Sequence, residues 1–246
     1  MDNLLSIAAS GLRSRMESLD MLANNLANAG TNGYKADREF HGIYTAAEAE
    51  AGKNREITRM PQLEGSWIDF KQGGLRNTGN PLDIALDGKG FLAVDGPDGV
   101  LYTRNGSLSF DAKGGLRAEG GYPVRRVGGG SFRIDPAKPL TIHQDGSLEQ
   151  GGASLGRLEI ASFTDVQQLR KQGQTYLRPE DAKVRPDFSI TVTVHQGKLE
   201  NANVGEAESA VRLVALLRQF EMLQKAVMIS GEMGRKVGEE VAKVGS

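Results

Sequence analysis

Residues 5–26 read LSIAASGLRSRMESLDMLANNL and carry the clearest periodic pattern of the chain. Leucine recurs every seven residues in this stretch, and further large apolar residues fill the same stripe: Leu5, Leu12, Met16, Leu19, Leu22 and Leu26. A repeat of seven places side chains along one face of a helix, as in the seam of a coiled coil. We therefore expect a helix over residues 2–28 that ends before Gly30.

A second stripe of the same kind lies near the other end of the chain. Its members are three or four residues apart: Leu213, Leu216, Phe220, Leu223 and Val227. Asn203 with Glu206 three residues later resembles a capping box, so this helix is expected to begin near Asn203. Gly231, Gly234 and Gly238 follow Ser230, and each costs a helix about 1 kcal/mol relative to alanine. We expect a firm helix to about Ser230 and a tail that becomes fully ordered only when packed.

The residues between the two stripes have the pattern of β structure. Turn dipeptides separate short apolar runs at Asp87-Gly88, Asp95-Gly96, Asp98-Gly99, Asn105-Gly106 and Asp145-Gly146. Such pairs are strong hairpin signals. Apolar and polar residues alternate over 82–86 and 188–194, which predicts strands with one buried face. No helix-length segment interrupts this region, so alternating β-α-β architecture is excluded.

These patterns predict an α+β fold in which long, coiled-coil-like terminal helices flank a mainly antiparallel β domain. Residues 36–70 show no clear period and are interpreted as a linker or extended arm. The expected division is therefore 1–35 for the first helix and its turn, 36–70 for the arm, 71–200 for the β domain and 201–246 for the final helix.

Composition excludes several classes of protein. The 246 residues carry a net charge of −1, so no general attraction to nucleic acid is expected. There is no cysteine, which excludes disulfides and thiolate metal sites. No segment approaches the ~20 apolar residues of a membrane span. The first residues carry an acid where a signal peptide has lysine or arginine, and Ser10 and Gly11 interrupt the apolar run, so no cleavable export signal is expected.

No set of residues indicates catalysis or a bound cofactor. The histidines, His41, His143 and His195, are far apart and form no short-spaced ligand pair. Gly88-Lys89-Gly90 resembles part of a phosphate loop, but a strand-like run follows it where a helix would be needed. We expect no catalytic, cofactor-binding or metal-binding residues and no small-molecule substrate.

The two apolar stripes allow two interpretations. Both helices pack onto the β domain of their own chain, or they bury their stripes against neighbouring copies. The second interpretation makes the chain a building block, and the candidate interface residues are then the members of the two stripes named above.

Three separated blocks, in the same order, resemble the bacterial flagellar basal-body rod and hook proteins. The residues that carry the resemblance are Asn24, Asn25, Leu26, Asn28, Thr31, Asn32, Gly33, Tyr34, Asp83, Gly88, Gly90, Phe91, Thr103, Arg104, Gly106, Glu200, Asn203 and Val204. Ala202 departs from the family pattern, which usually has serine there. The run from Arg218 to Met222 and the short chain are more similar to the proximal-rod type than to the distal-rod type, which is a close alternative.

The resemblance implies a structural subunit of the rod, the periplasm-spanning drive shaft of the flagellum. It implies export through the flagellar export apparatus without a cleaved signal, helical assembly through the terminal helices, and partners among copies of itself and other rod and hook proteins. Neither membrane insertion nor binding to nucleic acid is implied. Two other functions compete with this one: an oligomeric β-domain protein for binding or adhesion, and a cell-wall glycan hydrolase, for which the sequence offers no carboxylate pair.

Overall fold

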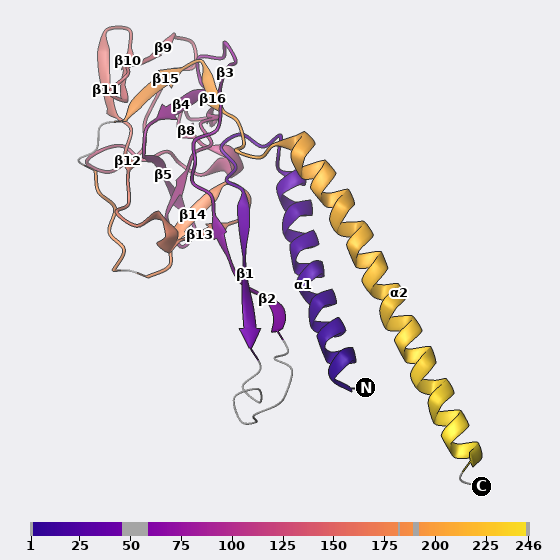
Figure 1. Cartoon of the computed structure of the whole chain (residues 1–246). Helices are drawn as coiled ribbons and strands as arrows, with labels where there is room; N and C mark the ends of the chain where they lie inside the picture. The colour runs from indigo at the N-terminus through magenta and orange to yellow at the C-terminus, as the bar shows by residue number, and fades with distance from the viewer. Residues whose placement is uncertain (1, 46–58, 182, 189–191, 245–246) are drawn as a thin grey trace. The chain divides into compact units, whose positions relative to one another are not determined.

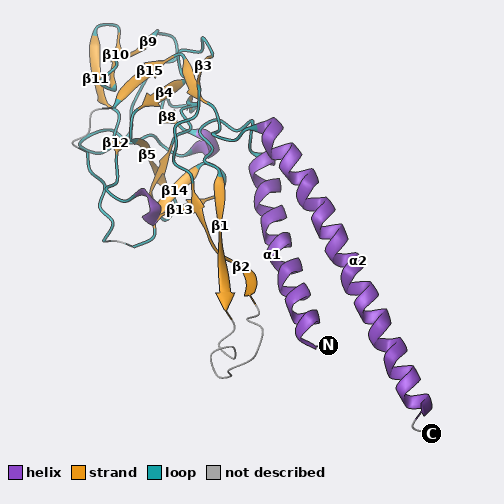
Figure 2. Cartoon of the chain, viewed as in Figure 1, coloured by secondary structure: helices purple, strands orange, loops and turns teal. Residues whose placement is uncertain are grey.

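The computed structural model describes residues 2–45, 59–181, 183–188 and 192–244 (Figures 1 and 2). In chain order the elements are α1 (Asp2–Ala27), β1 (Asp37–Thr45), β2 (Arg59–Ile68), β3 (Leu75–Asn77), β4 (Ile84–Asp87), β5 (Phe91–Gly96), β6 (Gly99–Thr103), β7 (Ser109–Phe110), β8 (Leu116–Arg117), β9 (Leu140–Ile142), β10 (Ser147–Gln150), β11 (Ala153–Arg157), β12 (Ile160–Ala161), β13 (Leu169–Gln172), β14 (Tyr176–Pro179), β15 (Thr193–Gln196), β16 (Lys198–Glu200) and α2 (Glu206–Val244). Short 3₁₀ turns lie at Glu119–Gly121 and Val166–Gln168.

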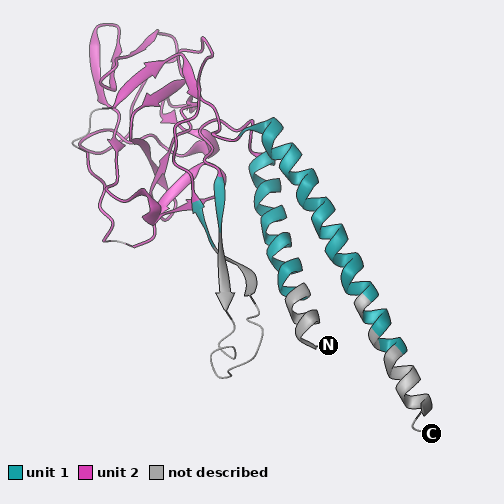
Figure 3. Ribbon diagram, in the orientation of Figure 1, with its two compact units in different colours: residues 1–27, 37–67, 205–246 teal, residues 28–36, 68–204 magenta. Residues whose placement is uncertain are grey.

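The chain forms two compact units, shown in Figure 3. Unit 1 contains residues 1–27, 37–67 and 205–246, and unit 2 contains residues 28–36 and 68–204. The fold is thus α+β, with an N-terminal helix, a C-terminal helix and a mainly antiparallel β domain, as the sequence predicts.

Unit 1 consists of the two long helices and a two-stranded sheet. Within it α1 and α2 run in opposite directions side by side, and β1 lies against α1 (Figure 1). The span of α1 matches the predicted helix over 2–28 to within one residue at its C-terminal end. That the helices form a coiled coil stays a prediction.

Two expectations about the second helix are wrong. The helix α2 begins at Glu206, so Asn203 lies outside it and does not cap it. It also continues beyond Ser230 to Val244. Helix propensity alone does not determine where a helix ends. The glycines lower the stability of the last turns, but good helix formers lie between the glycines, and the continuous hydrogen bonds of the helix keep the backbone helical.

The segment expected to be a linker contains β1 and β2, which pair with each other. Its sequence does not alternate cleanly between apolar and polar residues, so no period-two signal indicates these strands. The Ala-Glu run over 46–51 lies outside the described residues.

Unit 2 is built around a five-stranded antiparallel sheet in the order β12-β5-β6-β14-β13. Strand β5, which lies between β12 and β6, contributes Leu92 and Val94 to the larger apolar core and Phe91 and Ala93 to a second core. Neighbouring residues of a strand point to opposite faces, so this sheet has a core on each side.

The last strands of unit 2 pair with its first ones. Strand β15 pairs with β4, and β16 pairs with β3, so that Val194 lies opposite Leu86 and Leu199 opposite Arg76. These two pairings join the beginning and the end of the β domain in the sequence. This register places Glu200 beside Leu75 at the start of the domain.

Two of the predicted turns form hairpins. Asp98 lies between the paired strands β5 and β6, and Asp145-Gly146 lies between β9 and β10. By contrast, β4 and β5 on either side of Asp87-Gly88 belong to different sheets. The expected single buried face over 82–86 is also wrong, since Asp83 and Ala85 are buried together with Ile84 and Leu86. Part of the second alternating run, 189–191, lies outside the described residues.

Candidate functional site

The face of α1 that is buried within unit 1 carries small and polar residues. Ser14, Ser18, Leu22 and Asn25 are buried, and their spacing of four, four and three residues places them in one row. Of the stripe predicted from the sequence, Leu22 belongs to this buried row, whereas Leu12, Leu19 and Leu26 are half-buried on a neighbouring row and Met16 is exposed. The side chain of Leu5 lies outside the described residues.

Among the described side chains of α2, the one buried apolar residue belongs to the predicted stripe. Leu216 is buried, and the rest of this row is half-buried: Leu213, Phe220, Leu223 and Val227. We call this row the inner stripe of α2. Whether any of these residues contacts a neighbouring subunit stays a prediction.

A further apolar stripe of α2 has no counterpart in the sequence analysis above. Its members are exposed and follow the same spacing of about three to four residues, with Arg218 and Lys225 interrupting it: Val211, Ala215, Met222, Ala226, Ile229 and Met233. Two positions along a helix turn a side chain by about 200°. Met222 and Ile229 therefore lie opposite Phe220 and Val227, and we call this row the open stripe.

The described part of unit 1 buries few apolar side chains. Its buried apolar residues are Leu22 and Leu216, whereas both large cores belong to unit 2. Of the exposed large apolar side chains, all but Val127 and Phe188 belong to unit 1. An apolar surface of this extent on helices marks an interaction site more often than a free surface.

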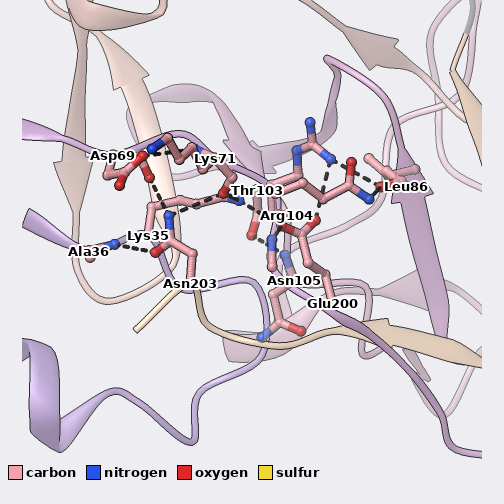
Figure 4. A network of polar contacts seen from close by, with 12 residues as sticks. Lys35, Ala36, Asp69, Lys71, Leu86, Thr103, Arg104, Asn105, Glu200 and Asn203 are labelled. Carbon is pink, nitrogen blue, oxygen red and sulfur yellow. Dashed lines mark hydrogen bonds and ion pairs between the residues drawn. The ribbon is translucent and has the colours of Figure 1, made fainter. Parts of the chain in front are cut away.

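The second feature of interest is a cluster of buried charges in unit 2, shown in Figure 4. The Glu200 side chain is 0% exposed, and its two carboxylate oxygens accept from different cations. Lys35 Nζ lies 2.6 Å from Oε1, and an Arg104 guanidinium nitrogen lies 3.3 Å from Oε2. We call Lys35, Arg104, Glu200 and Asn203 the polar clamp.

The clamp places charged side chains in the buried interior of unit 2. Burial lowers the pKa of Lys35 and of Arg104 below their ordinary values, and the Glu200 carboxylate opposes that effect at both. A buried carboxylate that binds two cations is stable because each group has a partner, and removing one of them leaves an uncompensated charge. Asp69, also buried, provides a second negative charge near Lys35.

Arg104 connects the clamp to the β4–β5 turn. Its guanidinium donates to the carbonyl oxygens of Leu86, at 3.1 Å, and of Gly88. It also lies over the ring of Phe91, 5.1 Å from the centroid, which is the geometry of a cation–π contact. Gly88, Phe91 and Arg104, three of the residues that carry the family resemblance, therefore form one group.

Asn203 joins three segments of unit 2. Its side-chain oxygen accepts from the Ala36 N–H at 2.7 Å, and its amide donates to the carbonyl oxygens of Asp69 at 2.6 Å and Lys71 at 3.1 Å. Lys35 Nζ donates to the same Lys71 carbonyl at 2.7 Å. These bonds explain why Asn203 does not cap the helix: its side chain is fully used within unit 2.

The segments that the clamp fastens are those next to the unit boundaries in the sequence. They are residues 28–36, 68–73 and 200–204. Within unit 2 the Asp69 N–H also donates to the Ala36 carbonyl at 2.8 Å, and the Gly73 N–H donates to Glu200 Oε1 at 3.0 Å. The clamp thus holds together, within unit 2, three of the four chain ends that lead into unit 1: those at Ala36, Asp69 and Asn203.

Two glycines allow this close approach of segments. Gly33 has a φ of +69°, and a Cβ there would lie 2.4 Å from the backbone of Arg104. Its N–H donates to the Glu200 carbonyl at 2.7 Å. At Gly106 a Cβ would lie 1.9 Å from the Ile84 carbonyl oxygen. Both belong to the residues that carry the resemblance.

We expect Gly106→Ala to lower the free energy of unfolding of unit 2 by about 1–3 kcal/mol, because the methyl group overlaps rigid backbone. Gly74→Ala is the matched control, since a Cβ at Gly74 meets nothing within 4 Å. It should change stability by less than about 1 kcal/mol. Urea unfolding of the full chain measures both, and equal effects of the two substitutions would contradict the assigned close contact.

Asn25 has a related role in unit 1. Its side-chain amide donates to the Asp37 carbonyl at 2.8 Å and its oxygen accepts from the Asp37 N–H at 2.9 Å. The end of α1 is thereby fixed to the first residue of β1. No periodicity in the sequence indicates this pair.

The other residues that carry the family resemblance do not belong to the clamp. Several have local roles: Asn28 accepts from Thr31, Asn32 from Arg76, and Thr103 donates to the Thr175 carbonyl. Asp83 accepts from Asn80, and Tyr34 lies under Lys171 Nζ at 4.2 Å. Gly90 is buried, whereas Asn24 is exposed and Leu26 and Val204 are half-buried.

The described residues offer little for other chemistry. They contain no group of three or more histidine, aspartate or glutamate side chains placed to hold a metal ion. His143 pairs with Glu149, and His195 lies 3.8 Å from Asp87. Among the described helices none has a stretch sufficiently long and apolar to cross a membrane.

Three family models match separate parts of this chain. Residues 5–35 match the flagella basal body rod protein model, and residues 85–150 match that of the flagellar hook protein FlgE/F/G D1 domain. Residues 195–238 match the flagellar basal body rod FlgEFG protein C-terminal model. The matched parts contain the clamp residues Lys35, Arg104 and Glu200.

Individual proteins are similar over almost the whole chain. The flagellar basal-body rod protein FlgF of Caulobacter vibrioides is 30% identical over 245 residues, which cover 99% of this chain and 100% of that protein. FlgG of Buchnera aphidicola subsp. Schizaphis graminum is 30% identical over 260 residues, covering 96% and 98%. FlgG of Bacillus subtilis is 28% identical over 250 residues, covering 91% and 93%.

Proposed function

Because this chain belongs to the flagellar basal-body rod protein family, we propose that it is a structural subunit of the flagellar rod, joined to its neighbours through the helices of unit 1. Its role in motility is mechanical and not enzymatic, and its place is the flagellar basal body with other rod and hook proteins as partners.

The observation that carries the assembly part of this proposal is the uncovered apolar surface of unit 1. The open stripe of α2 and Met16 of α1 are exposed, while Leu22 and Leu216 are the buried apolar residues of the described part of this unit. Each large apolar side chain contributes about 1.5–3 kcal/mol when it is fully buried. Contact with a neighbouring subunit would supply the burial that the single chain lacks.

The interface in this proposal consists of the predicted stripes together with the open stripe. The leucine row of α1 and the open stripe of α2 are different surfaces of one chain. A contact between them repeats from subunit to subunit without closing, which gives a helical polymer. Copies of the chain and other rod subunits with similar helices can both take part.

Three further parts of the proposal depend on the family and on the sequence. The subunit passes through the flagellar export apparatus without a cleaved signal peptide, and it occupies the proximal rod. Its chain is divided into terminal helices (1–35 and 201–246), an arm (36–70) and a β domain (71–200). The match to FlgF over 99% of the chain supports the proximal position, and the match to FlgG keeps the distal position as the alternative.

Limited digestion with trypsin tests the assembly role. In the free chain at low concentration, we expect early cleavage after Arg218 and Lys225, because α2 has too few buried contacts to resist local unfolding. Lys35 and Arg104 are buried in the clamp and serve as internal controls that stay uncut.

In purified basal bodies the same two α2 sites should be protected. Equal protection of α2 in the free chain and in basal bodies would mean that the helices need no neighbour, and the assembly part of the proposal would be abandoned. Absence of the chain from basal bodies would refute the rod role itself.

A further inference from the structure

Four of the exposed apolar side chains on the two helices are methionines. Met222, Met228 and Met233 are 62%, 63% and 62% exposed on α2, and Met16 is exposed on α1. Met222 and Met233 belong to the open stripe, whereas Met228 points about 100° away from Ile229, on the adjoining exposed face that also carries Leu217. Met21, on the same helix as Met16, is only half-buried and provides a comparison with lower exposure.

The methionine sulfur has a chemistry that leucine lacks. A peroxide transfers one oxygen atom to the thioether, so that the sulfur loses two electrons and becomes a sulfoxide while hydrogen peroxide is reduced to water. The product is polar, and a reductase can convert it back to the thioether. Access of the oxidant to the sulfur controls where the reaction takes place, and the three α2 methionines are accessible.

We propose that Met222, Met228 and Met233 are a reversible oxidation site that blocks assembly of the subunit. The inference rests on the proposed function, in which the exposed apolar surface of α2 is buried by a neighbour. A sulfoxide at that contact must be buried without a suitable donor, which is unfavourable. In the assembled rod the same sulfurs are covered, so the modification acts on the subunit before it is incorporated.

The first test measures where oxidation occurs. The full chain is treated with dilute hydrogen peroxide, and sulfoxide is quantified in each methionine-containing peptide by mass spectrometry. Met222, Met228 and Met233 should react several-fold faster than Met21 in the free chain. In purified basal bodies their rates should fall to that of Met21 or below. Unchanged rates of the α2 methionines in basal bodies would overturn the proposal.

The second test connects oxidation to assembly. Reduced and oxidised chains are incubated with basal bodies from cells that lack this subunit, and the bound fraction is measured. Oxidation should reduce binding at least about tenfold. All chains in this test carry Met16→Leu, because Met16 is exposed on the predicted interface of α1 and would also be oxidised. In this background the triple variant Met222→Leu, Met228→Leu, Met233→Leu keeps the size and apolarity of the α2 surface. It should bind as the reduced chain does, before and after peroxide treatment.

The outcomes separate the two proposals. If the oxidised chain binds as well as the reduced one, or if the leucine variant loses binding after peroxide treatment to the same degree, the oxidation site is refuted and the rod role stands. If the reduced chain and the leucine variant both fail to bind, the assembly role of the stripe fails first, and the oxidation site fails with it.

Discussion

Glu200→Gln should lower the free energy of unfolding of unit 2 by about 3–5 kcal/mol, the cost typical of breaking a buried ion pair from one side. The substitution keeps the shape of the side chain and removes its charge. Lys35 and Arg104 would then remain buried as two cations without the carboxylate that binds both. The Gly73 N–H would also lose a charged acceptor.

Urea unfolding of the full chain, followed by near-ultraviolet circular dichroism, measures this effect, because Tyr34, Tyr102 and Tyr176 are buried in unit 2. The matched control is Glu180→Gln, which removes the same charge from an exposed pair with Arg170 at 2.9 Å. It should cost less than about 1 kcal/mol. Equal effects of the two substitutions on the free energy of unfolding would show that the clamp stabilises unit 2 no more than a surface ion pair does.

A second substitution tests whether the clamp acts as a unit. Lys35→Met in the Glu200→Gln background removes one of the two stranded cations, so the double variant should be more stable than the sum of the single effects predicts. Additive effects would mean that Lys35 and Glu200 are independent in spite of their 2.6 Å contact.

The helices could be predicted from the sequence because their signal is local. The apolar residues of 5–26 repeat within one helix, and α1 spans the expected residues. The same holds for the hairpins at Asp98-Gly99 and Asp145-Gly146, where the turn residues lie directly between the strands that they connect. Strands β1 and β2 have no such signal: their pairing joins residues on either side of a connection of more than ten residues.

The clamp could not be predicted, because its members lie far apart in the sequence. Lys35 and Glu200 are separated by 165 positions, and each looks like an ordinary charged residue beside a glycine-containing turn. The resemblance selected Arg104, Glu200 and Asn203 without giving a physical reason for them. Asn203 was expected to cap a helix from its spacing to Glu206, and the structure uses it to join Ala36 to Asp69 and Lys71.

The open stripe was missed for a different reason. It has the same helical period as the inner stripe, displaced by two positions, but alanines at 215 and 226 and the charged Arg218 dilute its apolar character. The inner stripe is an uninterrupted run of five large apolar residues from Leu213 to Val227, whereas the open stripe has no large apolar member between Val211 and Met222.

A charge introduced into the open stripe should prevent assembly of the subunit without unfolding it. Ile229→Asp places a carboxylate in the middle of the open stripe, where it is solvated in the free chain. Since Ile229 is exposed, the stability of the single chain should change little. In a rod the same carboxylate would be buried against a neighbour without a partner, which is strongly unfavourable. We therefore expect incorporation into basal bodies to fall at least about 100-fold and swimming to stop.

The matched control is Gln219→Asp, because Gln219 is exposed on the same helix between the two rows and gains the same charge. Cells in which the native gene is replaced by either variant are compared for motility in soft agar and for the subunit content of purified basal bodies. Circular dichroism of both purified chains confirms that α2 is intact. If Ile229→Asp cells swim as well as Gln219→Asp cells, the open stripe faces solvent in the rod, and the contact between subunits must be sought on the leucine row of α1 or on unit 2.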